Sequence, residues 1–178
     1  MLDVEQFVAE CRSSLSESEP CLAVADLLER TMGDSSAVEE ALPTTRAEFT
    51  ALYHSPEMTV AKVVWAPGMS IWPHDHRMWA AIGIYTGQED NTFFRCVDQS
   101  LEPRRTREVA TKDVVLLGDD VVHAVHNPLG SFTGAIHVYG GDFFNREMSQ
   151  WDPDTLEPQS EVRSPESFFE EANERLGL

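Results

Sequence analysis

Two histidines separated by one residue are the strongest chemical signal in the sequence. They are His74 and His76, in the segment W-P-H-D-H. Residues two apart in a β-strand point to the same face. His74 and His76 would therefore project together into a barrel interior, where two imidazoles can hold one metal ion. Isolated H-x-H pairs also occur without any metal, so this pair alone leaves the question open.

A third ligand can come from the segment H-A-V-H, which contains His123 and His126. These two histidines are three apart and face opposite sides of a strand, so only one of them can join the pair. The apolar stretch 114–117 and the Gly-Asp-Asp turn after it place His123 just inside the next strand. We therefore expect His123, and not His126, to complete the set.

A last histidine lies in the segment A-I-H-V-Y, where His137 and Tyr139 share one face of a predicted strand. Such a pair can donate hydrogen bonds or handle protons. From residue type alone, a core histidine bonded to backbone and an ordinary packed aromatic are the simpler interpretations.

Three neutral imidazoles with no thiolate or carboxylate leave coordination positions open. Fe(II), Mn, Ni, Cu and Zn can all bind such a set. Zinc would favour hydration or hydrolysis, whereas Fe(II) would let a substrate and O2 meet at the metal. The spacing does not choose between them.

The elements that must position these residues follow from periodicity and breakers. Apolar residues at three- and four-residue steps predict a helix from Val4 to Leu15. Pro20 begins a second helix that stops at Gly33, and Asp34 or Ser35 caps a third. A final helix begins at Ser164-Pro165-Glu166. Short apolar stretches between these helical regions predict a β-sandwich or barrel: Met58–Trp65, Met78–Tyr85, Thr92–Val97, Val114–Leu117, Val121–Val125 and Phe132–Tyr139.

Two polar stretches within the β-region are predicted to lie in turns or at a strand edge. Glu89-Asp90-Asn91 is typical of a hairpin turn. Residues 104–107 (R-R-T-R) are expected in a solvated turn or a strand edge. We expect one domain over residues 1–178, with a helical preface at 1–48, a β-barrel at 49–146 and an acidic tail with a terminal helix at 147–178.

The composition excludes several classes of function. The net charge is −18, of which −15 lies in residues 1–60 and 145–178. This charge argues against nucleic-acid binding and against an anionic membrane surface. The N-terminus has no basic-then-apolar signal layout. Three cysteines without a CxxC suggest no disulfide framework, so we expect a cytoplasmic protein.

The histidine segments fit a longer pattern. Gly68, five residues, His74-Asp75-His76, three residues, Ala80, six residues and Gly87 match the frame of the first cupin motif, and His123 with Asn127 matches the second. The sequence thus resembles the cupin superfamily. This resemblance implies a mainly β fold, the cupin double-stranded β-helix (jelly-roll) barrel, with N-terminal helices and a short C-terminal helix.

Finer features resemble the thiol dioxygenases, the cysteine dioxygenase and 3-mercaptopropionate dioxygenase group of cupins. Ala80 occupies the usual glutamate-ligand position, as in that group. The segments W-A-P-G (65–68), H-D-H and I-H-V-Y-G (136–140) also resemble theirs. The resemblance implies Fe(II) held by His74, His76 and His123, with His137 and Tyr139 as catalytic residues. An apolar pocket wall is expected from strand alternation at Met78, Ala80 and Ile82.

Three departures from this group stand out. Ala135 replaces the serine of the Ser-His-Tyr triad, so the relay to His137 is incomplete. No cysteine lies near Ala80 to cross-link Tyr139, which should be an ordinary phenol. The carboxylate-binding arginine expected before the Trp65 strand is also missing.

The expected function is therefore a non-heme Fe(II) dioxygenase (EC 1.13.11 type) that oxidises a small organic thiol to a sulfinate with O2. Zn, Ni or Mn could also be the bound metal. The alternatives are a cupin oxygenase acting on a non-thiol small molecule and a metal-binding cupin without oxygenase activity. Its partners should be a small thiol and O2, in a monomer or homodimer.

Overall fold

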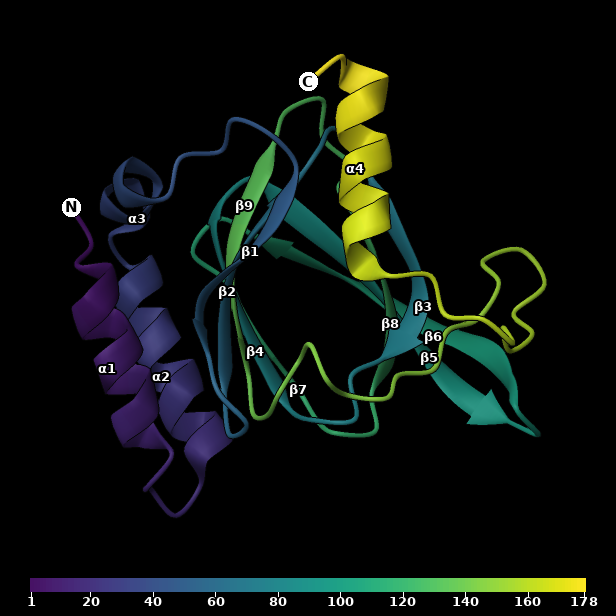
Figure 1. The fold of residues 1–178 in the computed structure, drawn as a ribbon, viewed down its shortest axis with the longest axis horizontal. Coiled ribbons are helices and arrows are strands. Elements are labelled where there is room, and N and C mark those ends of the chain that lie inside the picture. The colour runs from purple at the N-terminus through teal and green to yellow at the C-terminus, as the bar shows by residue number, and fades with distance from the viewer.

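Helices flank two β-sheets in a computed structural model that describes residues 1–178. Three helices, α1 (Val4–Ser14), α2 (Pro20–Met32) and α3 (Ser35–Ala41), lie on one side of the sheets, and α4 (Pro165–Leu176) lies over another edge (Figure 1). None of the helices is both long enough and apolar enough to span a membrane.

Both sheets are antiparallel, and their strand orders interleave segments that are distant in sequence. One sheet has the order β1-β2-β9-β4-β7 and the other β3-β8-β5-β6. The strands are β1 (Glu48–His54), β2 (Thr59–Trp65), β3 (Ser70–Asp75), β4 (Ala80–Thr86), β5 (Gln88–Val97), β6 (Ser100–Ala110), β7 (Val114–Leu117), β8 (Val122–His126) and β9 (Thr133–Tyr139). The predicted order of helices, barrel strands and a last helix is confirmed.

The N-terminal helices begin where the sequence indicates. The Asp3 carboxylate accepts a hydrogen bond from the amide of Gln6 at the start of α1, and Asp34 does the same for Ala37 at the start of α3. Pro20 occupies the first turn of α2, where its missing N–H costs nothing.

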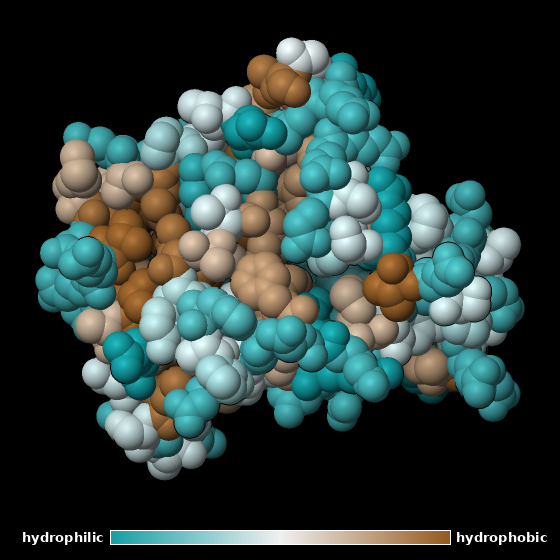
Figure 2. All heavy atoms as spheres, viewed as in Figure 1, coloured by the Kyte–Doolittle hydropathy of each residue, from teal (hydrophilic) through white to brown (hydrophobic).

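Helix α2 packs closely on the outer face of the five-stranded sheet. A Cβ built on Gly83 in β4 would lie 3.0 Å from Cγ of Met32, so the glycine lets the helix approach the strand. Strands β2 and β9 in the same sheet are buried along their whole length. On the face shown in Figure 2 most residues are hydrophilic, and hydrophobic residues gather beside the N-terminal helices.

Helix α4 is fastened to the barrel by one buried amide. Asn173 accepts a hydrogen bond from the Ala47 amide (2.9 Å) and donates one to the Ala47 carbonyl (2.8 Å). Phe168 and Phe169 on the same helix pack in the cluster that includes Trp65. These contacts hold α4 over the space between the two sheets.

The interpretation of Glu89-Asp90-Asn91 as a hairpin turn is wrong. The three residues lie inside β5, paired with β6 on one side, and β8 joins on the other from Asp90 onward. The side chains of Glu89 and Asn91 are fully buried. The chain turns earlier, at Gly87, whose φ of +84° suits glycine. Residues 104–107 lie on the exposed edge strand β6, as expected.

Replacing Asn173 by alanine should lower the free energy of unfolding by about 2–4 kcal/mol, because the buried amide and carbonyl of Ala47 both lose their partner. Urea unfolding measures the loss. The matched control is Glu174→Ala, an exposed neighbour on α4, which should change stability by less than about 0.5 kcal/mol. Equal effects of the two variants would contradict this role of Asn173.

Candidate metal centre

The three histidines converge on one point between the two sheets. His74 is in β3, His76 directly follows β3, and His123 is in β8, where it pairs directly opposite His74. The Nε2 atom of His76 lies 3.0 Å from Nε2 of His74 and 3.3 Å from Nε2 of His123. All three side chains are buried and are placed to hold a metal ion. His126 points to the exposed side and bonds Ser70, as the sequence predicts.

The outer nitrogens of two of these rings are held by oxygen acceptors. Nδ1 of His74 lies 2.8 Å from the Trp72 carbonyl oxygen, and Nδ1 of His123 lies 2.8 Å from Oδ1 of Asn91. A carbonyl oxygen can only accept, so Nδ1 carries the hydrogen in both rings. Their Nε2 lone pairs therefore point into the centre, as a metal ligand requires.

Burial keeps these rings neutral. It lowers the pKa of His74 to about 4, and it lowers the pKa of His76 and His123 well below the usual value, assisted by neighbouring histidines. Neutral imidazole is the form that binds metals.

The spacing of the nitrogens fits a first-row metal ion. With metal–nitrogen bonds of about 2.1 Å, ligand nitrogens lie about 3.0 Å apart at right angles and about 3.4 Å apart at tetrahedral angles. The observed 3.0 and 3.3 Å separations span that interval. Without a cation, the Nε2 lone pairs of His74 and His123 would share at most one ring N–H, that of His76, in a buried site, which is costly. The residues fit a metal, and the geometry does not choose which.

A second hydrogen-bonded group lies beside the histidines. The Tyr139 hydroxyl is 2.9 Å from Nδ1 of His137, and Nε2 of His137 is 3.4 Å from Oε1 of Glu89. The same carboxylate oxygen accepts the indole N–H of Trp65 at 2.5 Å. Burial raises the pKa of Tyr139. The tyrosine ring packs edge-on against His76, with centroids 5.2 Å apart.

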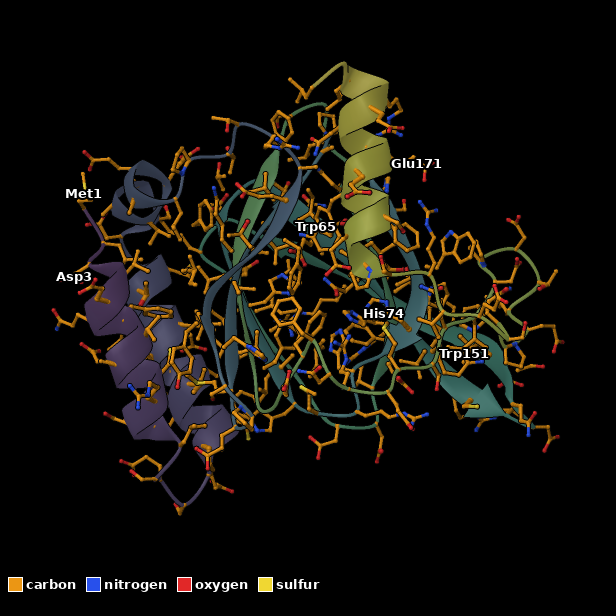
Figure 3. All side chains as sticks on the ribbon, viewed as in Figure 1. Met1, Asp3, Trp65, His74, Trp151 and Glu171 are labelled. Carbon is orange, nitrogen blue, oxygen red and sulfur yellow. The ribbon has the colours of Figure 1, made fainter.

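One cavity joins both groups under α4, where Trp65 and His74 are visible (Figure 3). The open space is small, about 30 Å³, and suits only a small ligand unless the wall moves. The rest of its wall is mainly apolar, with two arginines and one glutamine: Phe49, Val63, Ile71, Val125, Phe143, Met148, Pro165, Phe168, Phe169, Arg146, Arg163 and Gln150.

The two arginines differ in how fully they are engaged. Arg163 donates to Ser167 and pairs with Glu171. Arg146 donates from Nη1 to the Phe143 carbonyl and stacks its guanidinium 3.4 Å from the centroid of that ring, but its buried Nε has no partner. Burial lowers the pKa of Arg146.

The residues expected to form the pocket wall do not line this cavity. Ala80 and Ile82 are buried behind it, in a cluster that includes Tyr139, and Met78 packs against that cluster. The strand alternation that linked them to His76 is interrupted, because β3 ends at Asp75 and Arg77 adopts a φ of +52°. The chain then enters the other sheet at β4.

Five polar residues at or beside the cavity escaped the sequence analysis: Glu89, Asn91, Arg146, Gln150 and Arg163. The first two carry a usable signal, since positions 89 and 91 are in the same alternation as Phe93, whose ring stacks beside His123. Arg146 lies in irregular structure after β9, where no periodicity marks it.

No protein-family model matches this sequence, and none of the curated proteins shows significant similarity to it. Solved structures do resemble it. BH2720 from Bacillus halodurans is 17% identical, with 58% of this chain and 77% of that chain covered and a TM-score of 0.51. A conserved protein with a double-stranded β-helix domain from Klebsiella pneumoniae subsp. pneumoniae MGH 78578 is 13% identical, covering 65% of this chain and 94% of that one, with a TM-score of 0.49.

The chain has the cupin double-stranded β-helix fold, with its two interleaved antiparallel sheets. An oxalate oxidase bound to glycolate also matches, at 16% identity and a TM-score of 0.44 over 52% of this chain. This chain spans 45% of that oxidase. At these identities the likeness concerns the fold alone. The predicted cupin barrel is confirmed.

The metal-free protein should lose stability as the pH falls from 6.5 towards 5. Histidines in the unfolded chain become protonated near pH 6.5, whereas in the folded protein the pKa of His74 is lowered to about 4. Each such histidine costs about 1.4 kcal/mol per pH unit in that window. Urea unfolding in chelator measures the slope. His123→Asn should reduce it and the exposed His126→Asn should not. A flat profile would contradict the assignment of buried neutral rings.

His123→Ala should abolish metal retention after purification, and His126→Ala should leave it intact, because only His123 points its Nε2 into the centre. Metal content per chain is the measurement. Asn91→Ala keeps all three ligands but removes the acceptor that orients His123, so it should weaken metal affinity about 10- to 100-fold. Loss of metal from the His126 variant alone would overturn the strand register on which the site depends.

Proposed function

We propose that this protein is a three-histidine non-heme iron enzyme that uses O2 to oxidise a small organic thiol to a sulfinate. The observation that carries the proposal is the donor set: three buried neutral nitrogens converge, and the site has no carboxylate or thiolate ligand. Bound Fe(II) supplies redox chemistry and open coordination positions at such a set. The overall change is balanced, since a thiol and one O2 give a sulfinate and one proton.

The charges around the cavity favour an anionic ligand. Three neutral imidazoles leave the full positive charge of a divalent ion uncompensated. The half-buried Arg146 adds a second cation, and its buried Nε still lacks an acceptor. A thiolate would neutralise the first charge and an acidic group on the same molecule the second. Although residues 51–54 before the Trp65 strand hold no arginine, the segment after β9 brings Arg146 to the cavity.

The remaining wall protects and orients the ligand. Phe49, Phe143 and Phe168 present apolar rings to the cavity, which limits access of water to reactive oxygen chemistry. The hydroxyl of Tyr139 is the polar group beside His76 that can hydrogen-bond a small ligand. The small volume favours a thiol of a few heavy atoms.

Protein loaded with Fe(II) should consume O2 with short mercapto-carboxylic acids, and more slowly with neutral mercapto-alcohols or mercapto-amines. An oxygen electrode gives the rate, and mass spectrometry should find one sulfinate per O2. If none of the thiols in the panel supports O2 consumption, the proposal is refuted. Sulfinate-free consumption would favour an oxygenase acting on another class of molecule.

The matched variants are Arg146→Gln and the exposed Arg95→Gln. Loss of one charge-assisted hydrogen bond is worth about 1.5–3 kcal/mol. Arg146→Gln should therefore lower kcat/KM for the acids roughly 10- to 100-fold and leave the mercapto-alcohols within about threefold. Arg95→Gln should change neither.

A further inference from the structure

A buried chain of polar groups links the two sheets next to the histidine centre. It runs from Trp65 on β2 to Glu89 on β5, then to His137 and Tyr139 on β9. None of these side chains is more than 4% exposed. The neighbour on β9 that could have bonded His137 is Ala135, which has no hydroxyl. Glu89 supplies the partner from the opposite sheet.

The hydrogens of this chain can be assigned by counting donors. The indole N–H of Trp65 can only donate, so it fixes Oε1 of Glu89 as an acceptor at 2.5 Å. Nε2 of His137 faces that same oxygen at 3.4 Å. A neutral imidazole carries one hydrogen, and only a hydrogen on Nε2 makes this contact favourable.

The alternative arrangement places two acceptors face to face. With the hydrogen on Nδ1, the Nε2 lone pair of His137 would oppose the carboxylate oxygen in a space without solvent. Although 3.4 Å is long for a hydrogen bond, this repulsion disfavours the alternative tautomer by roughly tenfold or more. Nδ1 is then an acceptor, and the Tyr139 hydroxyl donates to it at 2.9 Å.

We propose that Glu89 is a positioning residue that holds His137 in its Nε2–H tautomer and thereby makes the Tyr139 hydroxyl a hydrogen-bond acceptor towards the cavity. The hydroxyl has one hydrogen, and His137 takes it. The oxygen lone pairs remain for a ligand that donates an S–H, O–H or N–H. The inference rests on the proposed function only in taking that ligand to be a thiol.

The test reads the tautomer directly. In protein labelled with ¹⁵N-histidine and loaded with diamagnetic Zn²⁺, long-range ¹H–¹⁵N correlation spectra distinguish protonated from unprotonated ring nitrogens, and a His137→Gln spectrum assigns the signals. We expect Nε2–H and an unprotonated Nδ1. A hydrogen on Nδ1, or on both nitrogens, overturns the inference.

Two substitutions at Glu89 separate positioning from packing. Glu89→Leu removes the acceptor and should lower the Nε2–H to Nδ1–H ratio by roughly tenfold. Glu89→Gln retains a carbonyl oxygen for Trp65 and His137 and should restore the original tautomer. An unchanged ratio in the leucine variant overturns the role of Glu89.

A third variant covers the case in which Glu89→Leu does not fold. Trp65→Phe removes the competing donor on Oε1, so the His137 Nε2–H bond should shorten and its proton signal should move downfield. No shift would show that Glu89 is not the partner of His137. The tautomer and the reaction are tested separately. If His137 carries its hydrogen on Nε2 but no thiol is oxidised, only the proposed function is refuted. If a thiol is oxidised but the hydrogen is on Nδ1, only this inference is refuted.

Discussion

The structure depends on one electrostatic constraint: three imidazoles must point their lone pairs at a single buried point. Such an arrangement is unfavourable unless a cation sits there and each ring is held from behind. The carbonyl of Trp72 and the amide of Asn91 hold two of the rings. The pairing of β3 with β8 sets His74 directly opposite His123, so the register of these two strands determines the relative position of the two ligands.

Charge acts locally at this centre. Most of the net charge of −18 lies in residues 1–60 and 145–178, and at long range it disfavours the approach of anionic ligands. However, charges further than about 10 Å apart are largely screened at ordinary ionic strength. Arg146 and Arg163, which come from the same acidic C-terminal segment, line the cavity itself, whereas Glu89 bonds Trp65 and His137 without lining it. The formally charged side chains in the cavity wall are therefore cationic although the protein is acidic.

The parts of the fold that follow local rules were predictable from the sequence. Helix starts at Pro20 and Pro165 follow from proline chemistry, and His74, His76 and His123 follow from strand alternation within short segments. Pairings between distant strands, such as β2 with β9, have no local signal. Arg146 reaches the cavity only through the path of irregular chain after β9, which no residue pattern encodes.

The segment Glu89-Asp90-Asn91 shows why local propensity gave a wrong prediction next to the metal centre. Acidic and amide residues are uncommon in strands and common in turns, so Glu89 and Asn91 favour a turn when judged one by one. In the fold they are two apart on β5 and share its inward face. Asn91 orients the metal-side His123, and Glu89 contacts the tyrosine-side His137.

The two-residue spacing of Glu89 and Asn91 connects the metal-binding histidines with the His137–Tyr139 pair. A slip of β5 by one residue would turn both side chains outwards and bring Asp90 and Thr92 inwards in their place. Neither could repeat the contacts, because Asp90 is a methylene shorter than Glu89 and Thr92 lacks the amide oxygen that reaches His123. The orientation of a metal-facing ring and the hydrogen-bond direction of Tyr139 are thus set by a single strand register. Glu89 and Asn91 lower the strand propensity of β5, but their buried contacts are satisfied in only one register.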